Sequence, residues 1–222
     1  MNALVFVPKS NAHGKNDVTG AFLPEAVAFM RLHGIPPARR ITFDNTQDYR
    51  LRAKTVIDVL GRCERGTLEA VVFFCHGWRD GIQAGVQASF PAFCDALALR
   101  CVLNPVIILY ACSAGRDGDS DATDDNAPGA GDDGGFADKL RDELVKRGLS
   151  PRIFAHTCDG HTTRNPFVRV FDKSRTASGD WVVEPGSPQW PAWRKALKGP
   201  LRFTFPFLSR ADIAFALSQP GH

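Results

Sequence analysis

The fold of this chain is decided by two continuous apolar runs, AVVFFC at residues 70–75 and VIILYA at residues 106–111. Hydrophobicity that does not alternate along a strand predicts burial on both faces, as in the centre of a parallel sheet. Between the runs, apolar residues recur at helical spacing, which predicts a crossover helix at residues 88–100. Such a strand, helix, strand unit brings both strand ends to the same edge of the sheet.

Each run stops on a side chain that can take part in catalysis. The first ends on His76-Gly77-Trp78 and the second on Cys112-Ser113-Ala114-Gly115. Ligands bind at the carboxyl edge of open α/β sheets. A thiol and an imidazole delivered there by separate strands can act as nucleophile and base. We therefore expect Cys112 and His76 to form a catalytic pair.

The order and spacing of these motifs resemble those of the caspase-type cysteine peptidases, the group that includes metacaspases, legumain, gingipains and separase. The matching residues are FCHG at 74–77 and YACSAG at 110–115, and the 36 positions from His76 to Cys112 (112 − 76) leave room for one helix. The resemblance covers roughly the first 160 residues. It implies an α/β fold, a three-layer αβα sandwich with a mostly parallel sheet, and cysteine endopeptidase activity.

In this chemistry Cys112 is the nucleophile, because an imidazolium stabilises the reactive thiolate. His76 accepts the thiol proton and later returns it to the leaving amine. The backbone N–H groups of Gly77 and Cys112 can form the oxyanion hole, where they face the carbonyl oxygen as its charge develops. Such a site needs no metal and no organic cofactor, and its partner is a peptide or protein substrate.

The loop after a further strand, predicted at residues 151–155, completes the candidate site. In caspase-like enzymes this loop helps to form the pocket for the substrate residue before the cut. The local order of Ala155, Thr157, Gly160 and Arg164 looks similar to that loop. The candidate substrate-binding residues are Trp78, Asp80, Ser113, Thr157, Asp159, His161 and Arg164.

Substrate specificity does not follow from the resemblance. Many relatives with basic specificity carry an aspartate two residues before the nucleophile, where this chain has Tyr110. Arg164 favours an acidic substrate residue, whereas Asp159 or the Asp-rich stretch at 117–133 favours a basic one. Both choices remain open.

Two other functions compete with the peptidase interpretation. ACSAG at 111–115 also fits the small-x-Ser-x-Gly elbow of α/β-hydrolases, which would make Ser113 the nucleophile of an esterase and His156 or His161 its base. That fold normally places more chain between the two motifs. The third hypothesis is a caspase-like domain that serves as a non-catalytic binding module.

The whole chain divides into one α/β domain at residues 1–165 and a C-terminal extension at 166–222. The extension holds a β-hairpin, a Pro/Trp-rich segment whose tryptophans are expected to cap a core, and a short helix at 212–217. In the first domain, residues 136–145 predict an amphipathic helix with its charges on one face. Further strands are predicted at 3–7, 40–44, 167–171 and 181–184, and further helices at 22–32 and 51–60.

The stretch at 117–133 contains seven aspartates and no lysine or arginine. It cannot bury enough apolar surface to order itself, which predicts a mobile loop at about 116–134. Calcium binding, attraction of a basic substrate and use as a cleavable linker are the functional alternatives. Nothing in it resembles the twelve-residue calcium loop with its terminal glutamate.

Composition limits the function classes. The formal charge of +3 is small and the basic residues are dispersed, so nucleic-acid binding is not indicated. There is no apolar run of membrane-spanning length and no secretory signal, which predicts a cytoplasmic protein with no membrane partner. The six cysteines include no CxxC pair, so reduced thiols are expected.

Overall fold

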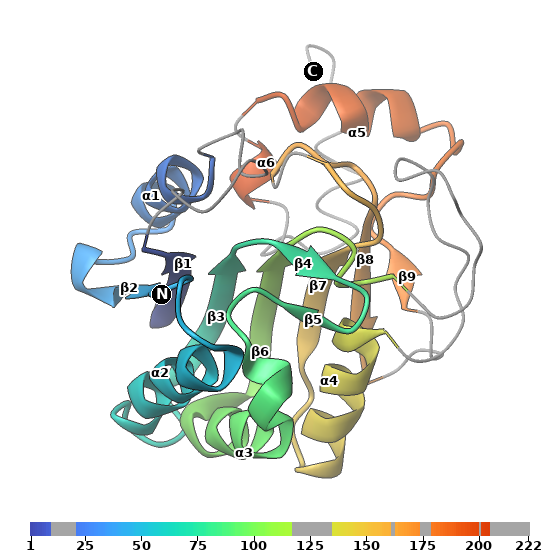
Figure 1. Ribbon diagram of the computed structural model, residues 1–222. Helices are drawn as coiled ribbons and strands as arrows, with labels where there is room; N and C mark the ends of the chain where they lie inside the picture. The colour runs from blue at the N-terminus through green and yellow to red at the C-terminus, as the bar shows by residue number, and fades with distance from the viewer. Residues whose placement is uncertain (10–20, 117–134, 161–162, 174–178, 200, 205–222) are drawn as a thin grey trace.

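The computed structural model describes residues 1–9, 21–116, 135–160, 163–173, 179–199 and 201–204 (Figure 1). The Asp-rich stretch, His161 and the helix predicted at 212–217 lie outside these ranges.

A seven-stranded mixed sheet, in the order β2-β1-β3-β6-β7-β8-β9, forms the centre of the molecule. Its first five strands are parallel, and β8 and β9 join antiparallel. The predicted α/β class with a mostly parallel sheet is therefore confirmed. The strands are β1 Ala3–Pro8, β2 Arg40–Phe43, β3 Leu68–Phe74, β6 Cys101–Tyr110, β7 Arg152–His156, β8 Val168–Asp172 and β9 Asp180–Trp181.

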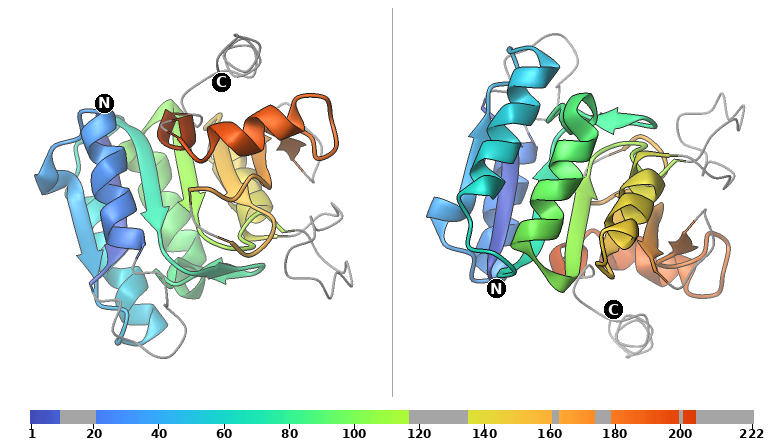
Figure 2. Two further views of the ribbon diagram at one scale, coloured as in Figure 1. Left: turned by 90° about the horizontal axis from the view of Figure 1, so that it is seen from above. Right: turned by 90° about the horizontal axis from the view of Figure 1, so that it is seen from below.

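Helices cover both faces of the sheet, as two continuous strands buried on both sides require (Figure 2). One face carries α1 (Phe22–Leu32), α5 (Trp190–Ala196) and α6 (Leu201–Thr204). The other carries α2 (Tyr49–Gly61), α3 (Phe90–Arg100) and α4 (Phe136–Lys146). Short 3-10 turns, Pro37–Arg39 and Val86–Ser89, precede β2 and α3, and a two-stranded hairpin, β4 Gly77–Trp78 with β5 Gly81–Ile82, follows β3.

Alternate residues of each central strand enter opposite cores. In β6, Ile107 and Leu109 pack toward α2, α3 and α4, whereas Ile108 and Tyr110 pack toward α1, α5 and α6. Side-chain direction in a strand alternates with a period of two.

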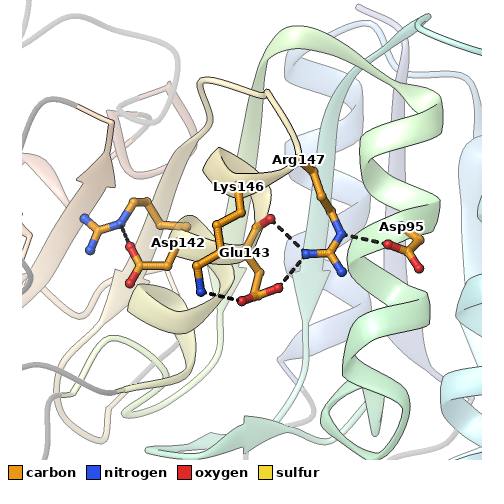
Figure 3. Close-up of polar contacts among 6 residues, drawn as sticks. Asp95, Asp142, Glu143, Lys146 and Arg147 are labelled. Atoms are coloured by element: carbon orange, nitrogen blue, oxygen red, sulfur yellow. Dashed lines mark hydrogen bonds and ion pairs between the residues drawn. The ribbon is translucent and has the colours of Figure 1, made fainter.

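Helix α4 departs from the expectation that its charges share one exposed face. Asp138 and Arg141 are buried and form an ion pair with each other, since a buried charge is tolerated when it is paired. The exposed part of α4 behaves as expected: Arg147 bonds Glu143 on its own helix and Asp95 Oδ1 on α3 at 2.7 Å, which ties the two helices together (Figure 3).

The C-terminal strands β8 and β9 extend the same sheet, with Arg169 opposite Trp181. Helix α5 forms within the Pro/Trp-rich segment, where no helix was expected. Its Trp193 is fully buried and donates from Nε1 to the carbonyl oxygen of Pro166 at 3.0 Å, so this tryptophan caps the core as predicted.

All six cysteines are free thiols. Within the described ranges, no helix is both long and apolar enough to cross a membrane.

Candidate active site

The ends of β3 and β6, which precede the two candidate catalytic residues, lie next to each other at one edge of the sheet. Phe74 pairs with Tyr110 in the parallel register, and the N–H of Cys75 donates to the Tyr110 carbonyl oxygen at 3.2 Å. His76 and Cys112 each stand two residues beyond that last pair. The predicted meeting of both strand ends at one edge of the sheet is therefore confirmed.

The turns that follow the two strands are in contact. A Cβ atom added to Gly77 would lie 2.6 Å from the Cys112 carbonyl oxygen and 2.7 Å from the Ala111 Cβ. Only glycine permits this approach, because real Cβ atoms do not come so close to backbone. The sequence His76-Gly77 thus brings the imidazole-bearing turn against the thiol-bearing turn.

The His76 side chain lies toward the α1 face. The Phe74 and Tyr110 rings, which directly precede the two turns, stack at 4.5 Å on that face. The His76 ring packs edge-on against Phe22 of α1, with ring centroids 4.9 Å apart. His76 and Cys112 are both half-buried.

The Cys112 thiol points at the 157–165 loop. Its Sγ lies 3.5 Å from the carbonyl oxygen of Gly160, and within the described chain no hydrogen bond joins it to His76. Burial raises the pKa of the Cys112 thiol above its usual value, the Asp159 carboxylate raises it further, and the bond to Gly160 offsets part of the rise. Burial at this site therefore favours the protonated thiol over the thiolate.

We predict that Asp159→Asn makes Cys112 more reactive. Removing the negative charge lowers the pKa of the thiol, so more thiolate is present at a given pH below that pKa, and alkylation should accelerate roughly two- to tenfold. Mass spectrometry of iodoacetamide labelling between pH 6 and pH 10 measures this. Asp80→Asn is the matched control, because Asp80 is exposed and does not contribute to the pKa shift of Cys112. An unchanged pH profile in Asp159→Asn would contradict the assignment.

Ser113 has an unusual backbone and a carboxylate partner. Its φ of 54° is the one positive value at a non-glycine position among the described residues, and its Oγ donates to Asp159 Oδ1 at 2.9 Å. An esterase elbow needs that hydroxyl to donate to a histidine. In the described residues it does not, and the ring of His156, one proposed base, is buried beside Tyr110 instead.

The turn at 112–116 is anchored from two neighbouring elements. The N–H of Gly115 donates to the His156 carbonyl oxygen at 2.7 Å, and the N–H of Ala137, at the start of α4, donates to the Ala114 carbonyl oxygen at 3.0 Å. Cys112 consequently sits on a turn that is fixed on both sides.

The 157–165 loop is built around a buried polar set. Asn165 bonds both the Cys158 carbonyl oxygen, at 2.9 Å, and the Phe167 N–H, at 3.0 Å. Thr157 is buried, and its Oγ1 has no hydrogen-bond partner among the described residues. This loop carries the carbonyl oxygen of Gly160 against the thiol.

Glu25 of α1 was not among the residues singled out from the sequence. It is buried, accepts a hydrogen bond from the Thr163 hydroxyl and raises the pKa of Tyr110 in addition to the larger effect of burial. The sequence does contain a signal for this residue. Glu25 lies on the same apolar stripe of α1 as Phe22 and Phe29, where a carboxylate is unexpected.

The other substrate-binding candidates lie at the surface. Trp78 packs edge-on against Tyr49, with ring centroids 5.9 Å apart. Asp80 is exposed, and its Oδ1 lies 3.9 Å from the Lys139 Nζ. Arg164 is exposed as well. The predicted site therefore has a buried centre around Cys112 and a charged outer part.

Over the described part of the chain, no group of three or more His, Cys, Asp or Glu side chains is arranged to hold a metal ion. In comparisons with known proteins, no family model, no curated protein and no solved structure matches the chain.

Proposed function

We propose that this protein is a cysteine peptidase of caspase-like type that uses Cys112 as nucleophile and His76 as general base. The observation that supports the proposal is the parallel register of β3 and β6, which pairs Phe74 with Tyr110, two residues before His76 and Cys112, at the carboxyl edge of the sheet. The three-layer arrangement around a mostly parallel sheet is compatible with the fold that the resemblance implies.

Catalysis begins with movement of the thiol. At rest Cys112 Sγ faces the Gly160 carbonyl oxygen at 3.5 Å. Rotation about its Cα–Cβ bond releases that contact and turns Sγ toward the adjacent His76 turn. The imidazole then takes the thiol proton, and the resulting ion pair offsets the cost of a buried thiolate.

The thiolate next attacks the carbonyl carbon of the scissile peptide bond. The C=O electron pair moves onto oxygen, where the N–H groups of Gly77 and Cys112 stabilise the negative charge. The imidazolium of His76 gives its proton to the leaving amine as the C–N bond breaks, which leaves an acyl-enzyme. Water, deprotonated by the same imidazole, hydrolyses the thioester and restores the thiol.

The residues around the thiol position the substrate. Ser113 is held by Asp159, and Thr157 and Arg164 lie on the same loop, so the substrate chain would run between this loop and the hairpin that carries Trp78 and Asp80. We further propose a cytoplasmic location, because reduced cysteines persist in reducing compartments and all six thiols are free.

Hydrolysis of a diverse peptide library tests the proposal. The wild-type protein should generate new N-termini with a shared residue preference before the cut, and Cys112→Ala should generate none above background. Equal cleavage by both proteins would contradict the proposal. So would a wild-type protein that cleaves nothing even after an added peptidase has cut its Asp-rich stretch.

A further inference from the structure

A groove that the proposed peptidase chemistry does not use lies between the second half of α1 and the segment from α5 to α6. Its volume is about 710 Å³, which is within the range of small-molecule sites. Helix α1 begins beside His76 and the groove is lined by its later turns, so the groove is separate from the candidate active site. Figure 2 shows these helices together on one face of the sheet.

The groove combines an apolar floor with a cationic rim. Ala28 and the exposed Leu32 supply most of the apolar surface, and the small exposed part of Phe203 completes the floor. The cationic lining residues are Arg31, Lys198 and Arg202, and no carboxylate is among the described residues that line the groove.

None of these three cations takes part in an ion pair among the described residues. Arg202 lies with its guanidinium 4.5 Å from the Phe203 ring centroid, and its Nη1 donates to the Lys198 carbonyl oxygen at 3.3 Å. Its Nε is buried and has no hydrogen-bond partner in the described chain.

Helix dipoles do not neutralise this charge. Arg31 lies in the last turn of α1 and Lys198 follows α5, positions where a cation offsets the negative end of a helix. Each helix end contributes at most about −0.5 charge, so two ends leave roughly +2 of the three positive charges uncompensated.

The groove is also preformed. The Tyr110 hydroxyl donates to the Arg202 carbonyl oxygen at 3.2 Å, and the His33 ring nitrogen Nε2 bonds the Phe203 carbonyl oxygen. These two bonds hold α6 against β6 and α1. A ligand therefore does not have to assemble the walls before it binds.

We propose that this groove binds a small amphiphilic anion, with a carboxylate or phosphate head held by Arg31, Lys198 and Arg202 and an apolar tail laid on Ala28, Leu32 and Phe203. A rigid guanidinium fork suits both kinds of head group. The apolar floor adds affinity in proportion to the tail area that it buries.

Isothermal titration calorimetry with monomeric decanoate and with decyl phosphate tests the proposal on the full-length protein. The double variant Arg31→Gln/Lys198→Gln should weaken binding at least tenfold. The control variant Arg39→Gln/Arg62→Gln removes the same charge from a second groove of about 450 Å³, which also contains Glu64, and should bind as the wild type does. Thermal unfolding without ligand verifies that each variant is folded. If the double variant does not fold, the single variant Lys198→Gln replaces it.

Each of the following binding measurements can overturn the proposal. Binding must weaken with added salt, and decyltrimethylammonium must not bind. Inorganic phosphate and acetate, which have the head group without a tail, must bind at least tenfold more weakly than the decyl compounds. Equal affinity of wild type and cation-deleted variant, or binding to anionic lipid vesicles without binding to the monomeric amphiphiles, would refute it. The decyl compound that binds more tightly, decanoate or decyl phosphate, identifies the head group that the groove prefers.

Discussion

Cys112→Ala is expected to lower kcat/KM for peptide hydrolysis by roughly 10⁴- to 10⁶-fold, because loss of a covalent nucleophile removes the whole acyl-enzyme route. The substitution should leave the fold intact, since Cys112 is half-buried and the hydrogen bond of its thiol among the described residues is a weak one, to Gly160 at 3.5 Å. Hydrolysis of a peptide selected from the library measures the effect, and thermal unfolding verifies stability.

Ser113→Ala is the matched control for this variant. It changes the next residue on the same turn and removes the hydrogen bond to the Asp159 carboxylate, a loss of roughly 1–3 kcal/mol in stability. We expect kcat/KM within about tenfold of the wild type, because the serine only positions the turn. The reverse pattern, with Ser113→Ala inactive and Cys112→Ala active, would establish the esterase alternative.

Gly77→Val is expected to have the second largest effect. Its new Cβ would meet the Cys112 carbonyl oxygen at 2.6 Å and the Ala111 Cβ at 2.7 Å, and backbone cannot give way as a flexible side chain does. The two turns must separate, which should cost about 1–3 kcal/mol in the free energy of unfolding and lower kcat at least about 100-fold. Urea unfolding and peptide hydrolysis measure the two effects.

Gly61→Ala is the control for the steric argument. An added Cβ at Gly61 has no neighbour within 4 Å and its φ is not positive, so this change should be neutral or stabilise the protein by up to about 1 kcal/mol. If Gly77→Val were as stable and active as Gly61→Ala, the two turns would not be in contact.

The sheet could be predicted because its strands carry a strong local signal. Runs such as residues 70–75 are continuously apolar, and glycine or proline marks the ends of several elements. Since parallel strands meet at one edge, the neighbourhood of His76 and Cys112 followed from sequence order alone.

Features that depend on tertiary partners could not be predicted. The amphipathic pattern of α4 does not reveal that Asp138 and Arg141 are buried together, because their pairing is a property of the packed helix. Helix α5 has seven residues, too few to be stable by local propensity alone, and burial of Trp193 stabilises it.

The sequence named candidate residues for the site, but it did not predict the directions in which their side chains point. Nothing local indicates that the Cys112 thiol faces Gly160, because that contact spans 48 positions. The same holds for Glu25, whose partner Thr163 lies on a distant loop. Such contacts form only when segments that are distant in the sequence come together at the edge of the sheet.

The most direct test of the Cys112/His76 pair is the rate of iodoacetamide labelling at neutral pH, followed by intact-protein and peptide mass spectrometry. Cys63 is the internal control, since it is also a half-buried free thiol and its Sγ bonds the Val59 carbonyl oxygen of the preceding helix α2. We predict that His76→Ala slows labelling of Cys112 at least about tenfold while leaving Cys63 unchanged, because the thiolate forms when the thiol rotates toward the imidazole. Labelling of Cys112 that is unaffected by His76→Ala, or that slows equally with Cys63, would contradict the Cys112/His76 pair.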